Sequence, residues 1–287
     1  MTHRIGIDIG GTFTDFVLID DATGGARLEK ILTTPADPSI AVLEGIEKLV
    51  AAARLPVSAL DAIVHGSTLV TNSVIERRGA ATGMLVTAGF RDVLDIGLER
   101  RYDLYDLRLR FPAPIVPRAL RCEVPERMRE DGQPLEAPDR AGVERAVRTL
   151  VDRHGVRAIA VCFLHSFVNP AHEEAVVELI RRRFPGLHVC GSAEVLPTMR
   201  EFERWTTATI NAFVQPIVDG YLARIEAGLA RIGFGGSFHV MTSSGGTVTP
   251  AVARRYPVRM LESGPAAGVF MASHLGNALG LGNVLSF

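Results

Sequence analysis

Apolar and polar residues alternate at the start of the chain, and this alternation predicts two strands joined by a tight turn. The strand-like runs cover residues 5–9 and 13–19, with Gly10, Gly11 and Thr12 between them. A third run at 27–33 extends the hairpin to an antiparallel meander. The opening of the chain is therefore predicted to be a three-stranded sheet.

Helical spacing of apolar residues follows this meander. It predicts a helix over 38–53, a short strand at 62–64, a helix over 70–78 and a strand at 81–86. Strands that alternate with helices across short connections indicate a layered α/β domain.

The pattern breaks between residues 97 and 138, where proline and arginine are frequent. We predict an irregular insertion there, ending in a hairpin over 118–128 and 133–135 that turns at 130–132. Regular alternation then resumes, with helices over 139–154 and 170–184 and strands at 158–163 and 188–190. We then predict a long helix over 201–232 that is broken at Pro216. After it come a strand at 238–241, a helix from 250, a last helix opened by 262–268 and a strand from 284.

Composition narrows the class of protein. The chain has 287 residues, a net charge of −1 and 47% hydrophobic residues, enough for one large or two smaller domains. The balanced charge gives no reason to expect a nucleic acid or a membrane surface as partner. No apolar run approaches the roughly 20 residues of a membrane helix, and no signal peptide precedes the first strand, so we expect a cytoplasmic protein. The three cysteines show no metal-binding spacing.

The first turn carries the clearest chemistry. Gly10 and Gly11 remove side chains and permit positive φ, so successive N–H groups can surround phosphate oxygens. Asp8 could hold Mg²⁺ through water, and Thr12 and Thr14 add hydroxyl groups. The segment lacks the lysine of a Walker loop and the helix of a dinucleotide fingerprint. It resembles the first phosphate loop of actin-like ATPases; the alternative is an ordinary hairpin turn.

Other segments have a structural as well as a functional interpretation. Residues 65–68 lie at a strand-to-helix junction, where His65 is either a donor or base, or a core histidine beside an N-cap. Residues 199–205 are either a functional helix start or a surface set of ion pairs. Residues 243–246 and 263–268 are either close-approach loops or tight turns.

Seven segments in order resemble the hydantoinase/oxoprolinase family, which includes 5-oxoprolinase, the hydantoinase A subunit and subunits of acetone and acetophenone carboxylases. The matching segments are 6–15, 65–68 with Thr71 and Asn72, 89–93, 104–107, 200–204, 244–246 and 263–268. The resemblance covers nearly the whole chain. Position 67 is Ser where the family usually has Thr.

The resemblance implies an enzyme that uses ATP to phosphorylate the oxygen of a cyclic amide such as hydantoin, 5-oxoproline or another lactam, which is then hydrolysed. It implies ATP and Mg²⁺ as cofactors, a hydantoinase B-type subunit or domain as partner, and a metal site at Asp8. The implied cofactor-binding residues are Asp8, Gly10, Gly11, Thr12, Thr14 and Asp15, and the implied catalytic residues are His65, Ser67, Thr68 and Arg204. Two alternatives remain: a subunit of an ATP-dependent ketone carboxylase, or a non-catalytic actin-like nucleotide-binding module.

The resemblance also implies the fold, an actin-like ATPase fold of the ribonuclease H-like α/β class. Residues 1–185 would form the N-terminal domain and 186–287 the start of the following domain. Family members continue beyond the strand expected at Val284 into a second phosphate loop, so we expect a fragment that is inactive alone.

Overall fold

The computed structural model describes residues 3–286. These residues divide into two compact units, residues 3–76 with 217–286 and residues 77–216. The second unit is thus inserted between two parts of the first. The predicted domain boundary near residue 185 comes from the family resemblance, not from the compactness of the fold, and it stays a prediction.

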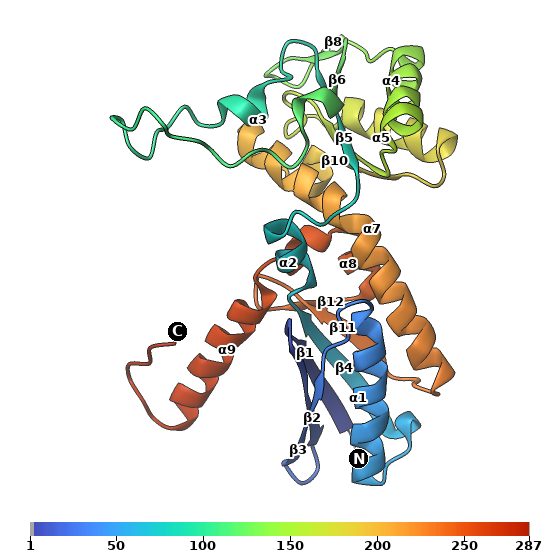
Figure 1. The fold of residues 1–287 in the computed structure, drawn as a ribbon, viewed down its shortest axis with the longest axis vertical. Coiled ribbons are helices and arrows are strands. Elements are labelled where there is room, and N and C mark those ends of the chain that lie inside the picture. Colours follow the sequence, from blue (N-terminus) through green and yellow to red (C-terminus); the bar gives the residue numbers. More distant parts are fainter. Residues whose placement is uncertain (1–2, 287) are drawn as a thin grey trace. The chain divides into compact units, whose positions relative to one another are not determined.

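The first unit is built on a six-stranded sheet in the order β12-β11-β4-β1-β2-β3. Its strands are β1 (His3–Ile9), β2 (Phe13–Asp20), β3 (Gly25–Leu32), β4 (Leu60–Ser67), β11 (Ser237–Met241) and β12 (Thr247–Val248). The predicted antiparallel meander β1-β2-β3 is confirmed. Strand β4 runs parallel to β1 and β11 parallel to β4, so the carboxyl ends of these three strands share one edge of the sheet (Figure 1).

Helix α1 (Pro38–Ala53) packs on β2 and β3 through its apolar face. It begins where the Asp37 carboxylate accepts a hydrogen bond from the Ser39 N–H at 3.1 Å, with proline in the first turn. Gly45 of α1 faces the sheet, and the Phe16 ring of β2 fills the space that a side chain at Gly45 would occupy. A Cβ at Gly45 would lie 2.0 Å from Cζ of Phe16. The close contact between Gly45 and Phe16 thus holds α1 against β2.

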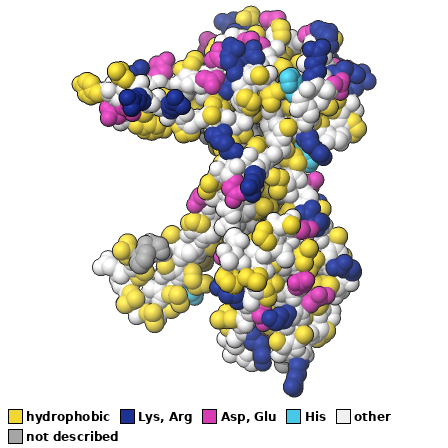
Figure 2. Space-filling model, viewed as in Figure 1, with side chains coloured by type: hydrophobic (Ala, Val, Ile, Leu, Met, Phe, Trp, Pro, Cys, Tyr) yellow, Lys and Arg dark blue, Asp and Glu magenta, His cyan; other side chains and the backbone are white. Residues whose placement is uncertain are grey.

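The other helices that lie wholly within this unit are α2 (Leu69–Ile75), α8 (Pro250–Arg255) and α9 (Ser263–Ala278), with 3₁₀ turns at Val57–Ala59 and Pro257–Met260. Helix α9 leaves large apolar side chains exposed, among them Val269, Phe270, Met271 and Leu275, and hydrophobic atoms gather over it in Figure 2. The strand expected from Val284 does not form over 284–286; Phe287 lies outside the described residues.

The second unit has a parallel four-stranded sheet in the order β10-β9-β5-β6. Its strands are β5 (Thr82–Thr87), β6 (Arg121–Val124), β9 (Ala158–Cys162) and β10 (His188–Gly191), and its helices include α3 (Val93–Ile96), α4 (Arg140–His154), α5 (Ala171–Arg183) and α6 (Ser192–Val195). Apolar residues of the sheet, α4 and α5 form one buried core that includes Leu85, Val147, Ile159 and Ile180. The two central strands, β5 and β9, are buried along their whole length, as expected for a sheet covered on both faces.

The predicted irregular insertion is partly confirmed. Residues 97–117 form no helix or strand, and Leu104, Tyr105 and Leu107 are largely exposed. The hairpin turning at 130–132 exists, but its strands are only β7 (Arg127–Met128) and β8 (Pro134–Glu136). The prediction of one long arm over 118–128 is wrong, because a 3₁₀ turn at Arg118–Leu120 leads into β6, which pairs with β5 instead.

Helix α7 (Glu201–Arg231) is continuous, so the predicted break at Pro216 is wrong. The compact units divide at this proline. Apolar contacts on both sides hold the helix together, and Ala212, Val214 and Val218 are all buried. None of the helices within residues 3–286 combines the length and apolar character needed to cross a membrane.

Candidate functional site

The loop of Gly10, Gly11 and Thr12 joins β1 to β2 and is braced from within the sheet. The Gly10 N–H donates to the Phe13 carbonyl at 2.9 Å. Thr33, just beyond β3, holds both ends of the loop: its hydroxyl donates to the Gly10 carbonyl at 3.0 Å and its N–H to the Thr12 carbonyl at 2.9 Å. The loop therefore has a fixed shape before any ligand arrives.

Two adjacent N–H groups of this loop are available. Among residues 3–286, the backbone N–H groups of Gly11 and Thr12 have no hydrogen-bond partner, and both residues are exposed. A Cβ at Gly11 would have no atom within 4 Å, whereas one at Gly10 would lie 3.2 Å from the Phe13 carbonyl oxygen. Neither glycine has a positive φ, so the turn does not use the conformational freedom that glycine permits. Glycine leaves space here for a close approach to the backbone.

Asp8 and Asp15 lie opposite each other on the exposed face of the β1–β2 pair. Partial desolvation by neighbouring groups, and secondly the charge of Asp15, raise the pKa of Asp8. Asp15 has a countercharge in Lys30, whose Nζ is 3.0 Å from its carboxylate. Gly66, beside Asp8 on β4, makes room for the carboxylate, because a Cβ there would lie 3.3 Å from Oδ1 of Asp8.

The Asp8 and Asp15 carboxylates repel each other but could both be stabilised by a hard cation. Two carboxylates on one face repel, and Mg²⁺ relieves that repulsion while accepting oxygen ligands from phosphate and water. The part of the chain that the structure describes contains no cluster of three or more His, Cys, Asp or Glu side chains suited to a metal. A magnesium ion at Asp8 would therefore depend on phosphate and water for its remaining ligands.

His65 lies on the opposite, buried face of β4. Its side chain has no exposed surface, and its Nε2 is 2.8 Å from the Tyr221 hydroxyl of α7. Burial lowers the pKa of His65 to about 4, so the imidazole is neutral at neutral pH. The side chain therefore faces the core in this structure, and the catalytic role of His65 stays a prediction.

Ser67, Thr68 and Thr14 also serve as supports in this structure. The Ser67 hydroxyl is buried and accepts from the Leu69 N–H at 3.1 Å. Thr68, which precedes α2, donates from its hydroxyl to the Ile9 carbonyl at 3.1 Å, next to the loop. Thr14 is buried with its hydroxyl 3.0 Å from that of Thr33, so it braces the loop, and its role in cofactor binding stays a prediction.

The start of α9 is fastened beside the end of β4. The Ser263 hydroxyl donates to the Ser67 carbonyl at 3.4 Å, and the Glu262 N–H donates to the Thr71 hydroxyl at 3.2 Å. A helix of 16 residues thus begins at this edge of the sheet, where its free N–H groups favour anions. Residues 243–246, by contrast, form the turn between β11 and β12, with φ of 80° at Gly245.

Arg204 belongs to the other compact unit and is fully buried. Its guanidinium donates to the Ser192 hydroxyl at 3.1 Å, the Thr198 carbonyl at 2.8 Å and the Phe163 carbonyl at 3.1 Å. These bonds occupy the side chain within its own unit. They support a structural role, and the catalytic role of Arg204 stays a prediction.

Sequence reasoning missed three residues of the site. Thr33 lies at a strand end and Tyr221 in a long helix, and neither has a local signal that points to the loop. Gly66 was part of a recognised motif, and its register opposite Asp8 would have revealed its role.

Comparison with known proteins agrees with this geometry. Residues 4–184 match the hydantoinase/oxoprolinase N-terminal region, and residues 204–287 match the hydantoinase/oxoprolinase family. The chain is 32% identical to caprolactamase subunit alpha of Pseudomonas jessenii, covering 99% of this chain and 41% of that one. It is 33% identical to the acetophenone carboxylase gamma subunit of Aromatoleum aromaticum, covering 99% and 40%. It is 29% identical to 5-oxoprolinase of Saccharomyces cerevisiae, covering 93% and 23%.

Solved structures give the same result. The ATP-dependent caprolactamase of Pseudomonas jessenii matches with a TM-score of 0.86 at 31% identity, over 96% of this chain and 41% of that chain. Nucleotide-free acetone carboxylase matches with a TM-score of 0.84 at 27% identity, with the same coverage. The chain spans about two fifths of the length of these relatives. The likeness agrees with the predicted actin-like ATPase fold of the α/β class. On the family match and these likenesses, the chain belongs to the hydantoinase/oxoprolinase family.

Proposed function

We propose that this chain supplies a phosphate-binding wall of an ATP-dependent enzyme that hydrolyses a cyclic amide. The observation that carries the proposal is the braced loop, whose exposed Gly11 and Thr12 N–H groups have no partner among the described residues and lie beside Asp8. Preorganised donors of this kind stabilise phosphate oxygens without reorganisation at the moment of reaction.

The chemistry follows from the stability of the amide. An amide carbon is a poor electrophile. Bound ATP with Mg²⁺ would supply its γ-phosphoryl group to the amide oxygen and leave as ADP; the activated carbon would then be open to attack by water, with the ring C–N bond broken and phosphate released. The residues of this chain would hold the ATP phosphates in place: the N–H groups of Gly11 and Thr12 bind phosphate oxygens, and Asp8 holds the magnesium ion.

The names of the relatives support the substrate class. Caprolactamase and 5-oxoprolinase are named for lactams, and a solved relative is named as ATP-dependent. A ketone carboxylase is the second candidate, since the acetophenone carboxylase subunit is as similar as the caprolactamase subunit. Several relatives are named as subunits, so we also propose a B-type partner subunit.

The test is an ATPase assay on the complete natural gene product, purified with any subunit that accompanies it. Lactams, hydantoins and ketones are offered in turn, with and without bicarbonate, and ADP and AMP are measured. We expect ADP release stimulated by a cyclic amide, and its loss in Asp8→Asn but not in the surface variant Asp152→Asn. Stimulation by a ketone only with bicarbonate would favour the carboxylase. ATP binding with no stimulation by any compound would favour a non-catalytic module.

A further inference from the structure

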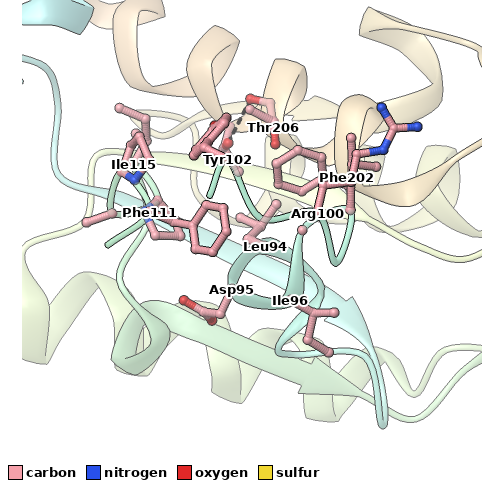
Figure 3. A pocket seen from close by; sticks show the side chains of 15 residues that line it. Leu94, Asp95, Ile96, Arg100, Tyr102, Phe111, Ile115, Phe202 and Thr206 are labelled. Atoms are coloured by element: carbon pink, nitrogen blue, oxygen red, sulfur yellow. Dashed lines mark hydrogen bonds between the residues drawn. The ribbon is translucent and has the colours of Figure 1, made fainter. Parts of the chain in front are cut away.

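Residues 98–111 form an irregular arm that extends away from the sheet of the second compact unit (Figure 1). The arm is anchored where it meets the rest of that unit. Phe111 of the arm and Phe202 of α7 line the same cavity at its root (Figure 3). Just after the arm, the Pro114 carbonyl accepts a hydrogen bond from the Arg77 guanidinium at 3.3 Å. The arm is therefore a projection with a fixed base.

The tip of the arm exposes large apolar side chains. Leu104, Tyr105 and Leu107 are 71%, 91% and 96% exposed, so the described residues leave them almost uncovered. Figure 2 shows hydrophobic and basic side chains together over this projection. Neighbouring apolar side chains that are left in water together mark a surface that binds another molecule.

Two aspartates shape the backbone of this tip. The Asp103 carboxylate accepts a hydrogen bond from the Tyr105 N–H at 2.9 Å, and the Asp106 carboxylate accepts one from the Arg108 N–H at 2.8 Å. Each is a local turn in which a side chain replaces a backbone partner. Docking such a tip costs less conformational entropy than docking an unstructured segment.

Positive charge surrounds the apolar tip. Four exposed arginine side chains of the arm form no ion pair within residues 3–286, namely Arg100, Arg101, Arg108 and Arg110. Arginine and tyrosine are enriched where protein surfaces meet, and a guanidinium pairs well with a carboxylate. The arm therefore fits a groove with an apolar floor and carboxylates along its rim.

Helix α9 exposes a different kind of apolar surface. Val269, Phe270 and Leu275 are exposed there, but the helix contains no Asp, Glu, Lys or Arg. A surface without charges is typical of a face that is covered within a fold, because unpaired charges are seldom buried. The arm instead places arginines among its apolar side chains, which is typical of contacts between separately folded proteins.

A lipid surface fits the arm less well than a protein does. Insertion of Leu104 and Leu107 would carry Asp103 and Asp106 into the membrane interface. Anionic lipids repel these carboxylates, and hydrocarbon does not solvate them. A protein groove can supply hydrogen-bond donors to both.

We propose that the arm is the docking element for the accompanying subunit of the enzyme. Leu104, Tyr105 and Leu107 enter an apolar groove of that subunit, and the arginines of the arm pair with carboxylates on its rim. The inference rests on the partner subunit of the proposed function and names the surface of this chain that binds it. The names of several relatives as subunits support a separate partner.

Photo-cross-linking tests the contact directly. Benzoylphenylalanine takes the place of Tyr105 in the complete gene product, purified together with its accompanying subunit. We expect cross-links to peptides of that subunit. The same amino acid in place of Leu135, which is 68% exposed on β8 of the same unit, should give none. Cross-links from Tyr105 to a second copy, to another segment of the same chain, or to nothing would overturn the proposal.

Affinity measurements give a second test. Leu104→Asp should raise the Kd for the isolated partner subunit about tenfold or more, since a carboxylate would enter an apolar groove. Leu135→Asp should leave that Kd within about twofold of wild type. Arg101→Glu should slow association at low salt and weaken its dependence on ionic strength. Because all three residues are exposed, circular dichroism should show unchanged folding.

The outcomes separate this proposal from the proposed function. Lactam-stimulated ATPase with an unchanged Kd in Leu104→Asp would overturn the arm and leave the function standing. Cross-links from the arm to the subunit, without any stimulated ATPase, would support the arm and overturn the function. Flotation of the wild type with anionic vesicles, lost in Leu104→Asp, would show a membrane contact and overturn the docking of a protein.

Discussion

At the scale of single residues, the position of a residue along a strand decides whether its side chain is buried and supports the site or is exposed beside it. Side chains alternate between the two faces of a strand. His65 and Ser67 therefore share the buried face of β4, while Gly66 between them lies opposite Asp8. Within one motif, the polar side chains stabilise the sheet and the glycine shapes the site.

The buried imidazole gives a pH prediction. The folded pKa of His65 is about 4, below its ordinary 6.5. Its stabilising contribution is therefore complete above pH 6.5 and is lost as the pH falls from 6.5 towards 4, because the unfolded chain binds the proton more tightly. Between pH 7.5 and 4.5 the wild type should lose about 2.5 kcal/mol more unfolding free energy than His65→Leu. Urea titrations at both pH values measure this; parallel losses would contradict the assignment.

Gly11 gives a prediction about the loop. A side chain at this position meets open space and no positive φ, so Gly11→Val should fold with a stability within about 1 kcal/mol of wild type. The same side chain would stand where phosphate approaches, so the Kd for ATP should rise about tenfold or more. Calorimetric titration of the complete gene product tests this. Gly235→Val, also in open space but away from the loop, is the control.

At the scale of elements, a buried polar network holds the carboxyl edge of the second sheet. The Glu173 carboxylate accepts hydrogen bonds from the Phe163 N–H at 2.8 Å, the Ser192 hydroxyl at 2.6 Å and the Ala193 N–H at 2.8 Å. Arg204 of α7 joins it through Ser192 and Phe163. The network links the segments after β9 and β10 to α5 and α7. Such networks are costly to break because each remaining group stays buried.

Arg204 and Arg200 form a matched pair for testing this role. Arg204→Met should lower the unfolding free energy by about 3 kcal/mol, since buried acceptors lose their donor. Arg200→Met, one turn earlier and exposed, should change it by less than about 0.5 kcal/mol. Denaturant titration measures both. If Arg204→Met kept wild-type stability but lost ATPase activity, the catalytic prediction would be favoured over the structural one.

At the scale of the whole molecule, each compact unit has its own buried core. Ile63 of the first unit and Ile159 of the second are both fully buried in central strands. Only α7 and the chain near residue 77 pass from one unit to the other. Two cores joined in this way can unfold separately.

A pair of identical substitutions tests that independence. Ile63→Ala and Ile159→Ala should each destabilise their own unit by about 2–5 kcal/mol, through lost burial and the cavity left behind. Hydrogen exchange with mass spectrometry should show faster exchange only in 3–76 and 217–286 for the first variant, and only in 77–216 for the second. Equal acceleration throughout the chain in both variants would show a single cooperative unit.

Local pattern was a good guide to the elements and a poor one to their orientation. The meander, the glycine loop and the parallel strands at 82–87 and 158–162 agree with the predicted pattern. The predictions were wrong where contacts with residues distant in the sequence determine the structure. Residues 121–124 form β6 and pair with β5 instead of joining the predicted hairpin, and α7 continues through Pro216. Tertiary packing overrides local propensity in such places.

The sequence by itself determined the class of fold, the glycine loop between β1 and β2, and the family, because these depend on the periodicity of apolar residues and on motifs contiguous in the chain. Only the tertiary structure decided which polar residues face solvent. Tyr221 reaches His65 from 156 residues away and takes it into the core, and Thr33 rather than the loop itself fixes the shape of the turn. The physical reason is that burial and hydrogen bonding depend on long-range pairing, which no local pattern specifies.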